Sequence, residues 1–107
     1  MSKNTPEKSE TQDKVINYFN DLISKGHPLM YFHRVAGGPT YIKGSCDLYC
    51  VYDGLHIEIE CKRLNGGIVS IDQEKWAFKC KKCGIPYLLV NDFNKFKESF
   101  DKILNAL

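Results

Sequence analysis

Residues 45–62 read SCDLYCVYDGLHIEIECK, and the shape of the domain follows largely from this stretch. Two runs rich in apolar, aromatic and β-branched residues, 45–52 and 55–63, flank the pair Asp53-Gly54. An Asp-Gly pair between two such runs is a strong signal for a two-residue β-hairpin turn. The stretch therefore predicts two antiparallel strands that meet at Asp53-Gly54.

The predicted hairpin has one apolar face. A symmetric turn pairs residues at equal distances on either side of it, and alternate side chains of a strand share a face. A slip of one residue would mix polar and apolar side chains on each face, so the pattern supports this register. The apolar or weakly polar side chains of this face are Cys46, Leu48, Cys50, Tyr52, Leu55, Ile57, Ile59 and Cys61.

The opposite face of the hairpin carries the polar side chains. Asp47 is predicted directly across from Glu60, with Cβ atoms about 5 Å apart. Like charges in this position destabilise a sheet, and a hard divalent cation between the two carboxylates removes the repulsion. Lys62 lies two residues beyond Glu60 and projects from the same face. Two carboxylates, a cation and a lysine suit phosphodiester hydrolysis, because the cation activates water and the lysine stabilises charge on the phosphate.

The chain before the hairpin predicts a helix and a strand. Apolar residues at helical spacing indicate a helix over 6–25, with Thr5 as its N-cap and Gly26 as its stop signal. Residues 30–35 predict a short strand. Residues 36–44 contain Gly-Gly-Pro and predict a flexible loop.

The chain after the hairpin predicts a helix, a strand and a last helix. Ser70 and Gln73 have the spacing of a capping box at the start of the second helix. Residues 86–90 predict a short apolar strand. Asn91 or Asp92 then caps a helix that carries an apolar stripe. The predicted order is αβββαβα, which is a mixed α/β fold.

Length and composition place limits on the class of protein. The 107 residues suggest a single domain over 1–107, and the net charge of +2 neither requires nor forbids nucleic-acid binding. The chain has no apolar run near the roughly 18 residues of a membrane span and no secretory signal at its start. We therefore expect a cytoplasmic protein without a membrane partner.

The five cysteines do not indicate a disulfide framework, because their number is odd and no export signal precedes them. Cys80 and Cys83 form a single CxxC pair. A structural zinc site needs four ligands, and no second ligand pair is apparent. A zinc-stabilised interaction domain remains an alternative interpretation, which metal analysis of the purified protein would test.

The order and spacing of several motifs resemble a known nuclease family. The runs Gly44-Ser-Cys-Asp47-Leu48, Asp53-Gly54 and Ile57-Glu-Ile-Glu60-Cys-Lys62 resemble the PD-(D/E)XK nuclease superfamily. Within it, the chain from about Glu7 to Leu104 is similar to the VRR-NUC (virus-type replication-repair nuclease) domain, in its stand-alone phage or bacterial form. The features that narrow the resemblance are a glutamate-containing first helix, Arg34, Gly37-Gly38, and Ser70-Ile-Asp-Gln73 before Trp76. Cys46 stands where the family pattern has proline.

This resemblance implies a restriction-endonuclease-like αβββαβ core with an added C-terminal helix. It also implies an endonuclease that uses Mg²⁺ or Mn²⁺ and cuts branched DNA, including Holliday junctions, as a homodimer. Asp47 and Glu60 match the metal-binding acids, Lys62 the catalytic lysine and Gln73 the supporting glutamine. A glutamate of the first helix completes the metal site, for which Glu10 is our choice and Glu7 the reserve.

Other roles are open at this point. The basic residues near the motif predict DNA contacts, and Glu58 either supports the site or meets solvent. Trp76 and Phe78 are expected in the core or at a dimer contact, in preference to stacking on bases. The alternatives are a flap or duplex nuclease, and a non-catalytic nucleic-acid-binding module with the same fold, for which facing carboxylates would be unnecessary. The predicted DNA contacts are His33, Arg34, Lys43 and Arg63.

Overall fold

The structure is a computed structural model that describes residues 8–35, 37–39, 41–62 and 69–106. It confirms the predicted α/β order, including the C-terminal helix. The elements are α1 (Lys8–Ser24), β1 (Leu29–His33), β2 (Leu48–Tyr52), β3 (Leu55–Cys61), α2 (Ile71–Lys82), β4 (Tyr87–Val90) and α3 (Phe93–Asn105).

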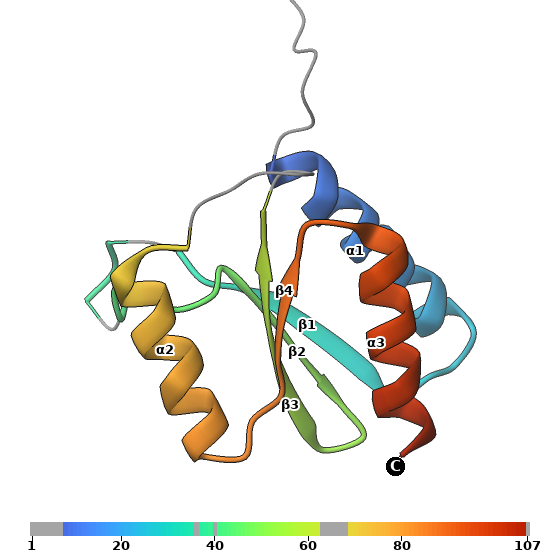
Figure 1. The fold of residues 1–107 in the computed structure, drawn as a ribbon. Coiled ribbons are helices and arrows are strands. Elements are labelled where there is room, and N and C mark those ends of the chain that lie inside the picture. The colour runs from blue at the N-terminus through green and yellow to red at the C-terminus, as the bar shows by residue number, and fades with distance from the viewer. Residues whose placement is uncertain (1–7, 36, 40, 63–68, 107) are drawn as a thin grey trace, which may run out of the picture.

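The four strands form one mixed sheet in the order β1-β2-β3-β4. β2 pairs antiparallel with both β1 and β3, whereas β4 runs parallel to β3. The sheet lies between α2 on one side and α1 and α3 on the other (Figure 1). The described helices include none with the length and apolar character that crossing a membrane requires.

The hairpin has the predicted turn and register. Asp53 and Gly54 both have positive φ, 50° and 87°, which is the backbone geometry of a type I′ turn. The β2–β3 ladder runs from Tyr52 opposite Leu55 to Leu48 opposite Ile59, as the alternation of side chains predicts.

The first strand of the hairpin is shorter than predicted. β2 begins at Leu48 instead of residue 45. Ser45 donates its backbone N–H to the carbonyl of Ile42, so this part of the chain forms a turn before it joins the sheet. Residues 45–47 therefore belong to the loop that leads into β2.

The apolar face of the hairpin is the centre of the core. Leu48, Ile57 and Ile59 are fully buried there. α1 contributes Phe19 and α3 contributes Phe100, whose ring centroids lie 5.4 Å apart. The main hydrophobic cluster thus fills the space between the sheet and these two helices.

Local sequence signals set the starts of α2 and α3. Ser70 and Gln73 form both hydrogen bonds of the predicted capping box. Asp92, and not Asn91, caps α3, because its carboxylate accepts from the backbone N–H groups of Asn94 and Lys95. The predicted cap of α1, Thr5, lies outside the described residues.

Candidate functional site

Two buried glutamates lie on the sheet face that α2 covers. Glu58 and Glu60 are neighbours on that face of β3, and each is 1% exposed. Carboxylates are rarely buried this completely unless other groups donate hydrogen bonds to them or balance their charge. The partners of these two residues therefore show how the site is built.

Glu60, Lys62 and Gln73 form a closed polar cluster. The Gln73 amide donates from Nε2 to Glu60 Oε2 over 3.1 Å. Lys62 Nζ donates to Gln73 Oε1 over 2.9 Å and lies 3.7 Å from Glu60 Oε2. The side chain of Lys62 is only 13% exposed. The cluster joins the end of β3 to the first turn of α2.

Gln73 also forms part of the helix cap. Its Oε1 accepts the backbone N–H of Ser70 at 3.0 Å, and its own N–H donates to Ser70 Oγ at 3.1 Å. The amide is therefore anchored by the capping box while its two ends contact Glu60 and Lys62. One side chain fulfils both roles because the first turn of α2 faces the sheet here.

Asp47 lies in the loop immediately before β2 and is half-buried. The β2–β3 ladder ends at the pair of Leu48 and Ile59, so Asp47 and Glu60 each lie one residue beyond its last pair. The predicted direct pairing of Asp47 with Glu60 is not part of the ladder. The carbonyl oxygen of Asp47 accepts the backbone N–H of Arg34 over 2.7 Å, which ties the loop to the end of β1. Asp47, Glu60 and Lys62 therefore belong to the same end of the sheet.

Gly44 lets the loop before Asp47 pack directly on α2. Its φ is +89°, and a Cβ at this position would lie 2.4 Å from the carbonyl carbon and oxygen of Asp72. Real Cβ atoms do not approach backbone atoms this closely. The backbone at Gly44 therefore lies directly against the start of α2.

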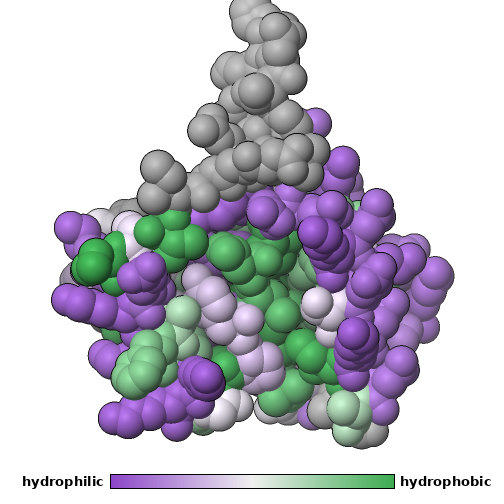
Figure 2. Space-filling view, in the orientation of Figure 1, coloured by the Kyte–Doolittle hydropathy of each residue, from purple (hydrophilic) through white to green (hydrophobic). Residues whose placement is uncertain are grey.

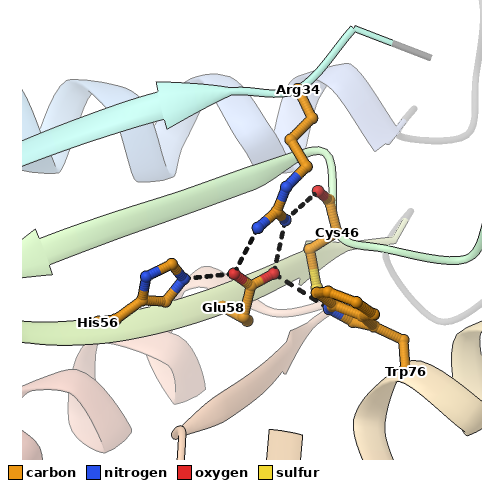
Figure 3. Close-up of polar contacts among 5 residues, drawn as sticks. All are labelled: Arg34, Cys46, His56, Glu58 and Trp76. Atoms are coloured by element: carbon orange, nitrogen blue, oxygen red, sulfur yellow. Dashed lines mark hydrogen bonds and ion pairs between the residues drawn. The ribbon is translucent and has the colours of Figure 1, made fainter. Parts of the chain in front are cut away.

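Glu58 has a separate set of partners (Figure 3). Arg34 binds it with two hydrogen bonds, from Nη1 to Oε1 at 2.6 Å and from Nη2 to Oε2 at 2.8 Å. Trp76 Nε1 of α2 donates to Oε1 at 3.1 Å, and His56 Nε2 also bonds to the carboxylate. Three side chains from two strand ends and a helix thus converge on one buried carboxylate.

These contacts fix the charge state of the pair. Burial by itself would raise the pKa of Glu58, but the hydrogen bonds from Arg34, His56 and Trp76 outweigh it and hold the pKa below its ordinary value. The hydrogen bonds to Glu58 in turn raise the pKa of the Arg34 guanidinium. Glu58 and Arg34 therefore form a buried ion pair at neutral pH.

Arg34 also holds the loop that carries Asp47. Its Nη1 donates to the carbonyl oxygen of Cys46 over 2.8 Å, and its backbone N–H binds the carbonyl of Asp47. The guanidinium lies 4.4 Å from the ring centroid of Tyr49 and 5.4 Å from that of Trp76. In the free protein, most of the guanidinium group is therefore engaged with other parts of the chain. A DNA contact through Arg34 stays a prediction.

Two of the remaining predicted DNA contacts, His33 and Lys43, are exposed. His33 is exposed in β1, and its ring packs against Tyr31, whose side chain faces α1. Lys43 is exposed in the loop, with its Nζ 3.5 Å from Asp72 Oδ2. The fourth predicted contact, Arg63, lies outside the described residues.

The described residues supply two candidate oxygen ligands for a divalent metal, Asp47 and Glu60. Mg²⁺ is commonly held by one or two protein carboxylates together with substrate phosphates, and Asp47 and Glu60 fit this donor set. Glu10 is exposed in the first turn of α1, which begins at the same end of the sheet as the end of β3 (Figure 1). No ready group of three acidic, histidine or cysteine ligands occurs within the described residues. Glu10 as third ligand stays a prediction, and its alternative, Glu7, lies outside the described residues.

The cysteines are free thiols, and four of the five are buried. Burial raises the pKa of Cys46, of Cys50 (to about 12) and of Cys80, which makes these thiols poor nucleophiles. Cys83 is exposed next to the end of α2. Within the described part of the chain, Cys80 and Cys83 are not joined by further metal ligands.

Sequence reasoning did not find the partnership of Arg34 and Glu58. The two residues are 24 positions apart in the sequence. They meet because β1 and β3 lie on either side of β2 in the sheet, so the Arg34 side chain can reach β3 across β2. The available signal was the alternation of β3, which places Glu58 on the same face as Glu60. Trp76 is partly buried and donates to Glu58. Phe78, expected in the core or at a dimer contact, is 66% exposed and therefore does not lie in the core.

Comparisons with protein-family models, with curated proteins and with solved structures found no match to this chain. What the site does must therefore be inferred from its own side chains.

Proposed function

We propose that this chain is a divalent-metal-dependent DNA endonuclease and that it belongs with the VRR-NUC domains of the PD-(D/E)XK superfamily. The observation that carries the proposal is the Gln73 amide, which bonds to the buried Glu60 carboxylate and to the Lys62 ammonium at once. A buried carboxylate beside a lysine is a costly arrangement for stability alone. Asp47 lies at the same end of the sheet as Glu60 and Lys62, which supports a chemical role for the cluster.

Each residue of the cluster has a distinct part in this proposal. Asp47 and Glu60 would hold Mg²⁺ or Mn²⁺, and Glu10 would complete the ligand set. When bound, such a cation activates water and neutralises charge on the phosphate. The Lys62 ammonium would stabilise negative charge that develops on the scissile phosphate. Gln73 holds Glu60 and Lys62 in fixed orientation, so little reorganisation is needed when substrate arrives.

The proposed substrate is branched DNA, and the proposed active form is a homodimer. The helices and strands of the described residues all belong to this one fold, and none of them forms a separate sequence-reading module. Contacts to the phosphate backbone position a protein on DNA without reading its sequence, so recognition by shape fits this chain better. Two copies related by a twofold axis would present two sites, one for each of two strands of a four-way junction.

The test is cleavage of a four-way junction, a flap and a linear duplex built from the same strands. Each substrate is incubated with Mg²⁺, with Mn²⁺ and with EDTA. We expect metal-dependent cleavage that favours the branched substrates. Asp47→Ala and Lys62→Ala should each lower the rate by at least about a hundredfold, because each removes a group that acts on the reacting phosphate or its metal.

Asp13→Ala and Lys14→Ala serve as matched controls, because both residues are exposed on α1. The two substitutions remove the same charges as Asp47→Ala and Lys62→Ala. They should cleave like the wild-type protein. Cleavage that survives both Asp47→Ala and Lys62→Ala would show that the active site lies elsewhere. Tight DNA binding without cleavage under any metal condition would instead favour the non-catalytic binding module. Preference for the flap or the linear duplex over the junction would remove the junction as the substrate.

A further inference from the structure

The outer side of α2 carries two large apolar side chains in solvent. Ile71 and Phe78 are each 66% exposed. They are seven residues apart, close to two helical turns, so they lie on the same side of the helix. Large exposed apolar groups that cluster on a surface commonly mark a binding site.

Three lysines lie along the same side of α2. Lys75, Lys79 and Lys82 follow one another at spacings of four and three residues, which places them in one stripe about 10 Å long. All three are exposed. The acidic residues that line the two hollows of this surface are Glu74 and Asp72. With Lys43, the described lining carries four lysines against two carboxylates, so its net charge is positive. Figure 2 shows strongly hydrophilic and apolar surface side by side over α2.

The apolar and basic side chains surround shallow hollows. The larger hollow has a volume of about 510 Å³ and is open to solvent. A smaller hollow of about 160 Å³ adjoins it and shares Lys75 and Lys79. The second hollow also includes Ile42 and Lys43 of the loop that packs on α2 through Gly44. The residues that line the larger hollow are Ile71, Glu74, Lys75, Phe78, Lys79 and Lys82.

We propose that this outer side of α2 binds an unpaired strand of nucleic acid. Lysines neutralise phosphates, and an exposed aromatic ring between them can stack on a base, which is how proteins commonly hold single strands. In this arrangement Lys75, Lys79 and Lys82 contact the backbone and Phe78 stacks on one unpaired base. The inference rests on the proposed function, because it names the part of a branched substrate that this surface holds.

The surface leads toward the candidate active site. Its smaller hollow reaches Lys43, which lies only four residues before Asp47 in the same loop. The first turn of α2 carries Gln73 on its inner side, so one helix contacts both the catalytic cluster and the proposed strand. A strand bound along α2 would pass over this loop on its way to the cleavage site.

Charge argues for nucleic acid over a second copy of the chain. Two copies packed through this face would bring their lysine stripes together, and like charges across an interface oppose association. A polyanion meets the lysines with opposite charge and releases its counterions on binding. The apolar groups between the lysines suit bases, which a duplex keeps stacked inside.

The test measures binding without catalysis. Fluorescence anisotropy in EDTA follows a labelled oligothymidylate and a blunt duplex of equal length across a series of salt concentrations. The triple variant Lys75→Gln, Lys79→Gln and Lys82→Gln should weaken binding and lower the slope of log K against log salt by about 2. Glutamine keeps the helix propensity close to that of lysine, so the fold is retained.

The matched control changes three exposed lysines of α3, Lys95→Gln, Lys97→Gln and Lys102→Gln, with the same loss of charge. It should leave binding nearly unchanged. An equal loss of affinity in both triple variants would overturn the proposal, because total charge and not this surface would then explain binding.

Phe78→Ala separates stacking from charge. We expect at least about a fivefold loss of affinity for oligothymidylate and no change for the duplex. Met30→Ala, which removes another exposed apolar side chain, is the control and should change neither. An equal effect of Phe78→Ala on both nucleic acids would overturn the stacking role. A shift from dimer to monomer in Phe78→Ala at unchanged DNA affinity would overturn the proposal and assign the face to self-association.

Failure of this inference differs from failure of the proposed function. Junction cleavage that is lost in Asp47→Ala but unaffected by the α2 variants would retain the nuclease and remove the strand-binding surface. Binding of oligothymidylate that depends on α2, in a wild-type protein that cleaves nothing, would retain the surface and remove the nuclease.

Discussion

Replacing Arg34 with leucine would leave the Glu58 carboxylate buried with only His56 and Trp76 as hydrogen-bond donors. Leucine keeps much of the buried volume, so the change mainly removes charge and hydrogen bonds. It would also release the carbonyl of Cys46, which Arg34 Nη1 holds at 2.8 Å. We expect a large loss of stability and a looser loop before Asp47.

The size of the loss follows from burial. Removing one partner of a buried ion pair costs about 3–5 kcal/mol, because the other charge stays in a poor solvent. Glu58 is 1% exposed but Arg34 is 24% exposed, and two donors to Glu58 remain, so we expect about 2–3 kcal/mol. A domain of this size has a total stability of about 5–15 kcal/mol. The midpoint of thermal unfolding should fall by about 10–20 °C.

The assay is urea unfolding followed by circular dichroism, with thermal unfolding as a second measurement. Lys25→Ala is the matched control, since it breaks an exposed ion pair with Asp21 and should cost less than about 0.5 kcal/mol. Adding Glu58→Gln to Arg34→Leu should restore about 1 kcal/mol, because a neutral amide is easier to bury than an unpaired carboxylate.

The lowered pKa of Glu58 predicts how the stabilising effect of the ion pair changes with pH. The pKa of Glu58 is lower in the folded protein than its ordinary value of 4.5. The ion pair therefore contributes its full stability above this value and loses it as pH falls through the lowered pKa. The difference in unfolding free energy between wild type and Arg34→Leu should shrink as pH falls below 4.5. A loss under about 1 kcal/mol at neutral pH, or a double variant no more stable than Arg34→Leu, would refute this account of the pair.

Three further predictions concern the loop, the cluster and the thiols. Gly44→Ala should destabilise the fold by about 2 kcal/mol in urea unfolding. The new Cβ would lie 2.4 Å from the backbone of Asp72, and the backbone φ at residue 44 is positive. Unchanged stability would contradict the close packing. Gln73→Glu replaces the amide donor to Glu60 with a second carboxylate. It should lower the cleavage rate at least about tenfold while the circular dichroism spectrum stays native. A variant with wild-type activity would show that Gln73 has no role in the site. Iodoacetamide should modify Cys83 first in the native protein and all five cysteines only after unfolding. Mass spectrometry of the intact protein and of its peptides measures this order. Rapid labelling of a buried thiol would contradict the packing.

The hairpin and the helix caps could be predicted because they depend on residues close in sequence. Asp53-Gly54 needs positive φ at both positions, and the alternation on either side allows only one register. Ser70 and Gln73 are three residues apart, so their capping box is also local. The hairpin places Glu60 and Lys62 on one face of the sheet. The grouping of Gln73 with them was implied only by the family resemblance, because it depends on how α2 packs against β3.

The contacts around Glu58 could not be predicted because they depend on the order of strands in the sheet. Arg34 at the end of β1 reaches Glu58 on β3 across the width of β2. Nothing near Arg34 in the sequence distinguishes a residue that holds a loop from one that contacts phosphate. The third metal ligand is open for the same reason, since the position of Glu10 depends on how the start of α1 meets the sheet.

Cleavage of a four-way junction by Glu60→Gln, measured alongside Mn²⁺ binding by titration calorimetry, addresses the assignment of the active site. The substitution keeps the shape of the side chain and removes its charge, and Glu98→Gln is the exposed control on α3. We predict that Glu60→Gln loses both Mn²⁺ binding and cleavage, while Glu98→Gln and the wild-type protein retain both. Wild-type rates and unchanged Mn²⁺ affinity in Glu60→Gln would contradict a metal-dependent nuclease centred on Asp47, Glu60 and Lys62.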